Sequence, residues 1–330
     1  MKKTISFLKK YQLIGVFIGL LISVITIAVA ESINSNEVLY DNSSSLSNSE
    51  NVKDALDSLY NVVDKVGSGY VLVANNTTGL STQLVGGLYR YQGVQDANNN
   101  VDNYICFGTT NKSDCISDTD KYMYRIIGIN TSGQMKLIKK ETLNTTYQWN
   151  SINNGVEWPS SDLFAGLNGS YFLTNVDYVP DSSWSNRISI NVWKYGDLAS
   201  ADSTALEMYN TEMGLSGTTS AKIGLLYLHD WYYGLVGGNN CSSENYKCQT
   251  SWLPIPKNDS ASPNSTLEWT LMRADNKRIW GIDNSSGFPF SNGMGMWMDR
   301  SYSVRPVFFL KATETIASGS GTITDPYILS

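Results

Sequence analysis

Histidine and clustered positive charge are the scarcest features of this 330-residue sequence. It holds 1 His, and its 24 Lys and Arg against 30 Asp and Glu give a formal net charge of −6. Nucleic-acid binding needs a basic surface, and no Lys/Arg cluster occurs beyond the N-terminus, so we expect no nucleic-acid partner. A metal site with two histidine ligands is excluded. Histidine-based catalysis has only His229, beside Asp230, and a structural role at a strand end is favoured there.

Catalytic motifs are missing as well. The sequence contains no G-x-S-x-G, H-E-x-x-H or phosphate-loop pattern, and no cofactor is expected. Cysteine is limited to 4 residues, and neither the pair Cys106 and Cys115 nor the pair Cys241 and Cys248 has the two-residue spacer or nearby histidine of a zinc site. We therefore expect two short-loop disulfides, which form in oxidising compartments.

One long uncharged apolar stretch is present. Residues 13–30 follow Lys2, Lys3, Lys9 and Lys10, and about 18 apolar residues are enough to cross a bilayer core. The lysines favour a cytoplasmic N-terminus. Because Ala28-Val29-Ala30 also fits a signal-peptidase site, residues 1–30 are predicted to be either a signal anchor or a cleaved signal peptide. Both alternatives place the remainder outside the cytoplasm, anchored in the cell membrane or secreted to the cell surface.

The residues after the leader change character twice. Residues 31–48 are a polar, Ser/Asn-rich spacer. Residues 49–66 show apolar positions at spacings of three and four, which predicts a short coiled-coil helix. Its seam either packs on its own domain or joins copies into a homo-oligomer, through Val52, Leu56, Leu59, Val63 and Val66. Residues 67–86 read as a linker and first strand, ahead of a globular domain over residues 87–330.

The globular part is predicted to be α+β with mainly antiparallel strands. Residues 122–129 and 135–139 flank Thr131-Ser132-Gly133 and predict a hairpin. Residues 160–173 predict a helix capped by Ser160 or Ser161. Near the C-terminus, Met294, Met296 and Met298 alternate with Gly295 and Trp297, so that the methionines share one face of an extended segment.

Several segments resemble a family of surface proteins. "YRIIGI", "DLFAGLNGSYF", "YSVRPVFFL" and "GSGTITDPYIL" occur in the order seen in a domain of unknown function from gut-associated Gram-positive bacteria. The resemblance implies a C-type-lectin-like fold, related to formylglycine-generating enzymes, with no assigned activity. The cysteine pair of those enzymes is not matched by Cys241 and Cys248, which bracket a polar loop. The resemblance also implies that Arg305 lies in a central closing strand and projects toward a carboxylate or backbone carbonyls. Possible carboxylate partners are Asp162, Asp230 and Asp283.

The expected function is non-enzymatic binding at the cell surface. Loops that mix Tyr, Trp, Ser, Gly and Asn are typical of recognition surfaces for glycans or for host or partner proteins. The aromatic anchors predicted for this surface are Trp252, Trp280, Trp297 and Tyr302.

Three alternatives stay open at this point. Two carboxylates among Glu157, Asp162, Glu207 and Glu268 would suffice for a glycan or cell-wall hydrolase. A structural subunit of a surface appendage would also use the apolar leader. Alternating oxygens in a polar loop could present ligands to calcium, although the glycine turn and distal glutamate of an EF-type loop are missing and an ordinary loop is favoured; these residues are Asp96, Asn98, Asn100 and Asp102.

Overall fold

The computed structural model describes residues 80–93, 101–152, 155–199, 204–234, 252–253, 267–283, 288–289 and 295–330. All of these lie in one compact unit within Leu56–Ser330. The predicted leader, spacer and coiled-coil helix lie outside the described residues, as do Cys241 and Cys248. Within the described part of the chain, no helix combines the length and apolar character needed to cross a membrane.

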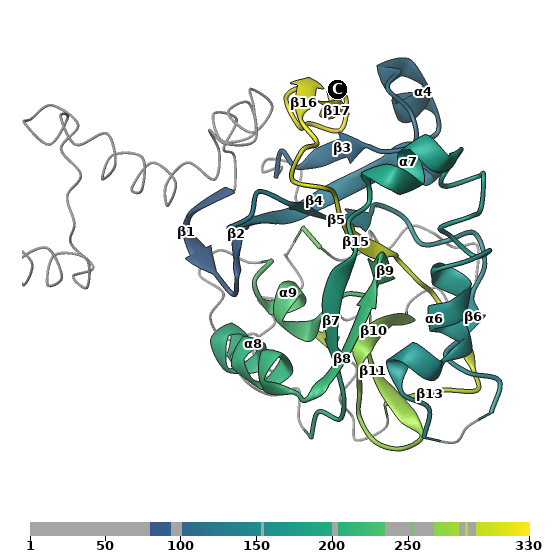
Figure 1. Ribbon diagram of the computed structural model, residues 1–330. Helices are drawn as coiled ribbons and strands as arrows, with labels where there is room; N and C mark the ends of the chain where they lie inside the picture. Colours follow the sequence, from purple (N-terminus) through teal and green to yellow (C-terminus); the bar gives the residue numbers. More distant parts are fainter. Residues whose placement is uncertain are drawn as a thin grey trace, which may run out of the picture. The chain divides into compact units, whose positions relative to one another are not determined.

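A hairpin forms the centre of the domain. β4 (Met123–Asn130) and β5 (Met135–Lys139) pair antiparallel, as the alternation around Thr131-Ser132-Gly133 predicted. Gly133 has φ 82°, a left-handed conformation that glycine adopts without steric cost. All residues of β5 and all of β4 except Asn130 are buried, so both faces of the hairpin are covered. Figure 1 shows β4 and β5 next to each other.

Seven strands make up the main sheet. Their order is β1-β2-β4-β5-β15-β9, and β3 also pairs with β4. Every pairing is antiparallel. β15 lies between β5 and β9, in the interior of the sheet. The remaining bounds are β1 Leu80–Val85, β2 Leu88–Tyr91, β3 Tyr104–Cys106, β9 Ile223–Gly224 and β15 Val307–Phe309.

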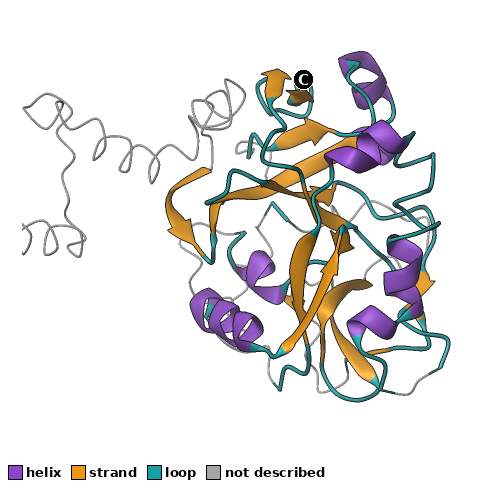
Figure 2. Cartoon of the chain, in the orientation of Figure 1, coloured by secondary structure: helices purple, strands orange, loops and turns teal. Residues whose placement is uncertain are grey.

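A second sheet and three strand pairs complete the β structure. The second sheet contains β10 (Leu267–Arg273), β11 (Arg278–Asp283), β12 (Phe288–Pro289) and β13 (Met296–Trp297). The antiparallel pairs are β6 (Tyr147–Gln148) with β14 (Ser301–Tyr302), β7 (Asn191–Tyr195) with β8 (Gly217–Ala221), and β16 (Ile316–Ser318) with β17 (Ile328–Leu329). Figure 2 shows the short helices placed around these strands.

The helices in the described part of the chain are short. They are α4 (Lys112–Ser117), α5 (Thr119–Tyr122), the 3-10 helix η3 (Trp158–Ser160), α6 (Asp162–Leu167), α7 (Ser182–Arg187), α8 (Ala205–Gly214) and α9 (Leu228–Tyr232). Polar side chains cap α4 to α8 at their N-termini. Ser161 caps α6, as predicted. The helix expected to reach residue 173 ends at Leu167. Its next residue, Asn168, instead exchanges hydrogen bonds with the backbone of Ile223 at the edge of the main sheet.

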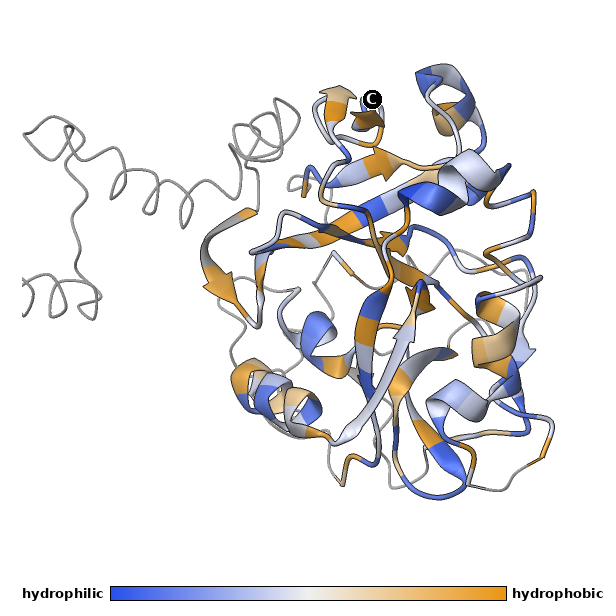
Figure 3. Cartoon of the chain, viewed as in Figure 1, coloured by the Kyte–Doolittle hydropathy of each residue, from blue (hydrophilic) through white to orange (hydrophobic). Residues whose placement is uncertain are grey.

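The core is rich in tryptophan. One continuous cluster of buried side chains joins both sheets, and its largest members include Trp149, Trp158, Trp193, Trp231 and Trp269. A second, small cluster contains Tyr104, Cys106, Cys115, Met123 and Ile328. Figure 3 shows apolar and polar residues alternating along several strands. The prediction of a mixed α+β domain with mainly antiparallel strands is therefore confirmed.

Candidate functional site

Three of the four predicted aromatic anchors are core residues. Trp252, Trp280 and Tyr302 are 2%, 7% and 9% exposed. The indole N–H of Trp252 donates to the carbonyl of Tyr91 at 2.9 Å, and that of Trp280 donates to the carbonyl of Leu198 at 2.8 Å. Their polar atoms are thus used inside the protein, as expected for buried tryptophans. This placement corrects the expectation that these three rings are surface contacts.

Trp297 is the predicted anchor that faces solvent. It lies on β13, where it pairs with Arg278 of β11, and its side chain is 37% exposed. Met296 and Met298 on either side are buried. The predicted alternation of this segment is therefore confirmed at residues 296–298. It holds Trp297 outward, because successive side chains of an extended segment point to opposite faces.

Charged side chains lie near this tryptophan. The guanidinium of Arg278 lies 5.9 Å from the Trp297 ring centroid and its Nε donates to Asp275 at 2.6 Å. Partial burial raises the pKa of Asp275, but hydrogen bonds from Arg278 and Lys277 lower it by more, so the carboxylate stays charged.

Hydrogen bonds tie the segment that contains Asn150 to the residue after Trp297. The N–H of Asn150 donates to the carbonyl of Met298 at 3.0 Å, and the Asn150 side chain donates to the carbonyl of Ile152 at 3.0 Å. The segments 148–152, 275–278 and 296–300 therefore meet at one end of the second sheet, near β11 and β13 in Figure 1. We call Trp297, Arg278 and Asp275 the Trp297 surface.

Carboxylates that could serve a hydrolase have structural contacts. Glu268 is buried in an ion pair with Arg305. Asp162 accepts the backbone N–H of Ser151 at 2.8 Å. Glu207 forms the capping box of α8, and Glu157 lies 3.9 Å from the guanidinium of Arg273.

Arg305 pairs with a carboxylate, although not with any of the three that were expected. Its Nε lies 2.9 and 3.1 Å from the two carboxylate oxygens of Glu268, and its Nη2 lies 2.9 Å from Oε2. Asp230 forms ion pairs with Arg90 and Lys136. Asp162 accepts a hydrogen bond from the backbone N–H of Ser151. The sequence indicated Glu268 only as a candidate catalytic carboxylate. Its pairing with Arg305 depends on the contact between β10 and the segment before β15, which the sequence does not show.

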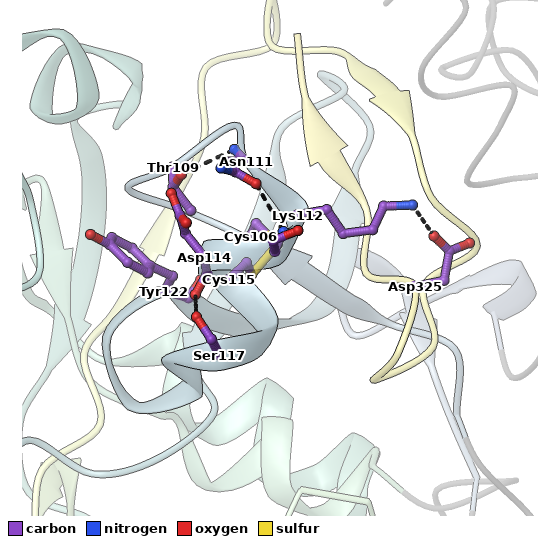
Figure 4. Close-up of a disulfide and its surroundings, with 10 residues drawn as sticks. Cys106, Thr109, Asn111, Lys112, Asp114, Cys115, Ser117, Tyr122 and Asp325 are labelled. Carbon is purple, nitrogen blue, oxygen red and sulfur yellow. Dashed lines mark hydrogen bonds and ion pairs between the residues drawn. A yellow bond between two sulfur atoms is a disulfide. The ribbon is translucent and has the colours of Figure 1, made fainter.

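The disulfide between Cys106 and Cys115 is confirmed (Figure 4). It joins β3 to α4. β3 also hydrogen bonds the C-terminal segment, where the N–H of Cys106 donates to the carbonyl of Tyr327 at 2.9 Å. Lys112 of α4 forms an ion pair with Asp325. The disulfide therefore fastens α4, β3 and the end of the chain together.

A buried charged cluster was missed by the sequence reasoning. It contains Arg90 of β2, Lys136 of β5, Glu212 of α8, and His229 and Asp230 of α9, all of them buried. Of these, the sequence drew attention only to His229 and Asp230. Charged residues inside the strands of Arg90 and Lys136 are the signal that could have found it, since unpaired charges are rarely buried.

Asp230 is the hub of this cluster. Its Oδ1 lies 2.7 Å from Nη1 of Arg90, and its Oδ2 lies 2.5 Å from Nζ of Lys136. Burial raises the pKa of Asp230, but the charges of Lys136, His229 and Arg90 lower it by more. Asp230 is therefore a carboxylate held between two cations.

His229 links the hub to α8. Its Nδ1 lies 2.5 Å from Oε2 of Glu212 and its Nε2 lies 3.4 Å from Oδ1 of Asp230. Glu212 also accepts the backbone N–H groups of Leu228 and His229, each at 2.9 Å, so α8 supplies the acceptors for the first turn of α9. The single histidine is thus held by structural contacts, but it lies in helix α9 and not at the strand end that the sequence favoured.

Metal binding and known relatives give no further guide. The structure does not describe Asp96, Asn98 or Asn100, and among the residues it does describe no group of three or more His, Cys, Asp or Glu side chains is arranged to hold a metal ion. Comparisons of the chain with protein-family models, with curated proteins and with solved structures find no match.

Proposed function

We propose that the protein is a non-enzymatic binding protein of the bacterial cell surface, which recognises a glycan or a host or partner protein through the Trp297 surface. The C-type-lectin-like architecture implied by the sequence resemblance belongs to this proposal. We also propose that residues 13–30 either contact the membrane or are removed on secretion. We further propose that residues 49–66 join copies of the chain into a homo-oligomer.

The exposure of Trp297 is the observation that carries the proposal. An exposed tryptophan costs little side-chain entropy to immobilise and offers a large flat apolar contact, which is why tryptophans dominate many binding interfaces. Arg278 and Asp275 beside the ring supply hydrogen-bond donors and acceptors of both charges. Such a mixture suits a polar ligand with an apolar face, as sugars and peptides have.

The hydrolase alternative has weaker support. General acid catalysis needs a carboxyl group that can exchange protons with the substrate. Glu268 is buried against Arg305 and Asp162 is occupied by a backbone N–H. The appendage alternative depends on residues 13–30, outside the described part of the chain, and has no observation in its favour.

Binding of the full-length chain to arrays of immobilised glycans and extracellular proteins tests the proposal. Trp297→Ala and Arg278→Ala are expected to lose most of the signal that the natural chain gives on its best partner. Ile190→Ala is the matched control, because Ile190 is 66% exposed and lies outside the Trp297 surface. The proposal fails if the natural chain binds nothing on the arrays, or if both surface variants bind as it does.

A further inference from the structure

Lys136 and Asp230 meet in the interior of the domain. Nζ of Lys136 lies 2.5 Å from Oδ2 of Asp230, and their side chains are 4% and 0% exposed. Lys136 comes from β5 in the middle of the main sheet and Asp230 from α9. The two residues are 94 positions apart in the chain. The amine and the carboxyl group are therefore brought together only by folding.

Aromatic rings surround the Lys136 amine. Its Nζ lies 4.9 Å from the ring centroid of Tyr227, 5.5 Å from that of Phe309 and 5.9 Å from that of Trp193. Burial lowers the pKa of Lys136, and the nearby carboxylate of Asp230 only partly opposes this. A buried lysine amine loses its proton more readily than one in water, and the neutral amine is the form that acts as a nucleophile.

We infer that Lys136 and Asp230 condense into an intramolecular amide cross-link. The ammonium gives up a proton, and Nζ attacks Cγ of Asp230. The Nζ–Cγ bond forms and the Cγ–Oδ2 bond breaks. Nζ keeps one hydrogen as the amide N–H, and the other two hydrogens leave with Oδ2 as water. Oδ1 becomes the amide carbonyl oxygen. No oxidant, reductant or other reactant is consumed.

Neighbouring side chains are placed to assist this step. Nη1 of Arg90 lies 2.7 Å from Oδ1, the oxygen on which negative charge develops during the attack. Arg90 is itself fixed by hydrogen bonds to the carbonyls of Val85 at 2.7 Å and Gly86 at 2.9 Å. Nε2 of His229 lies 3.4 Å from the same oxygen and helps to fix the orientation of the carboxyl group.

The cross-link also leaves the cluster balanced in charge. Condensation removes one positive and one negative charge, those of Lys136 and Asp230. The guanidinium of Arg90 and the carboxylate of Glu212 remain, one of each sign. Arg90 keeps its two backbone acceptors, and its contact with Oδ1 continues as a hydrogen bond to a carbonyl. After condensation Arg90 is held by carbonyl acceptors, and Glu212 by the backbone N–H groups of Leu228 and His229.

Trypsin digestion of the reduced full-length chain, followed by mass spectrometry, tests the inference. Trypsin does not cleave after a lysine whose amine is in an amide. The expected product is residues 126–139 joined to residues 223–247, with cleavage after Lys136 missing and a mass one water below the sum of the two peptides. Lys139 is the internal control: it is also buried but contacts the backbone carbonyl of Asp120, so cleavage after it is expected.

A peptide map without the joined peptide overturns the inference. If residues 126–136 and 223–247 are recovered as separate, full-mass peptides, no cross-link exists. Lys136→Met and Asp230→Ala should each abolish the joined peptide, but the map of the natural chain decides the question even if a variant does not fold. The inference does not rest on the proposed function, since the Trp297 surface contains neither residue.

Discussion

Arg305 and Glu268 form a buried ion pair that joins the two sheets. Glu268 lies in β10 of the second sheet, and Arg305 lies two residues before β15 of the main sheet. Both carboxylate oxygens contact the guanidinium Nε, at 2.9 and 3.1 Å. Such a pair contributes little net stability over an apolar pair of the same volume, but removing one partner leaves the other charge buried.

Single substitutions at this pair should therefore be more harmful than the double substitution. We expect Glu268→Met or Arg305→Met alone to lower the free energy of unfolding by about 3–5 kcal/mol, and the variant with both substitutions to recover much of that loss. Urea denaturation of the four proteins measures these values. Additive losses in the double variant would show that the two side chains do not act as a pair.

The Cys106–Cys115 disulfide should stabilise the end of the chain. Replacing both cysteines by serine is expected to lower the free energy of unfolding by about 2–3 kcal/mol, since the bridge closes a short loop. Amide hydrogen exchange should accelerate most in β3 and β17, which the bridged segment holds together. Unchanged exchange in these two strands would contradict this assignment of the disulfide.

Stability should depend on pH through Lys139. Burial lowers the pKa of Lys139 to about 8, below its unfolded value of about 10.4. The unfolded chain therefore binds more protons above pH 8, and stability should rise with pH from that point. Between pH 7 and 9.5 the natural chain should gain about 1–2 kcal/mol relative to Lys139→Met. If the unfolding free energies of the two proteins change equally with pH across this range, the pKa of Lys139 is not lowered by folding.

Trp280 and Trp297 should contribute very differently to stability. Trp280→Ala removes a buried ring and its hydrogen bond to Leu198, so we expect a loss of about 3–5 kcal/mol in unfolding free energy. Trp297→Ala changes a partly exposed ring, and about 1 kcal/mol or less is expected. Thermal unfolding distinguishes the two. A larger loss at Trp297 than at Trp280 would mean that Trp297 is a packing residue.

Local sequence patterns predicted the local structure well. The hairpin around Gly133, the Ser161 cap and the outward direction of Trp297 each follow from the order of a few neighbouring residues. The cysteine spacing likewise predicted the bridge between Cys106 and Cys115. These features depend on backbone geometry and short separations along the chain, which a sequence displays directly.

Long-range pairings were not predictable in the same way. The partner of Arg305 is 37 residues away, and that of Lys136 is 94 residues away. Several carboxylates were chemically acceptable to each, and only the packing of the sheets selects one. Trp252 shows the same limit, because a tryptophan in a polar loop has the same local pattern whether its ring packs inward or outward.

The affinity of the full-length chain for its strongest array partner, measured with Trp297→Ala and Ile190→Ala beside the natural protein, tests the binding proposal most directly. Trp297→Ala is expected to raise Kd at least tenfold, about 1.4 kcal/mol, while Ile190→Ala leaves Kd unchanged and both variants remain folded under the conditions of the binding measurement. Equal affinities for all three proteins would contradict the proposal.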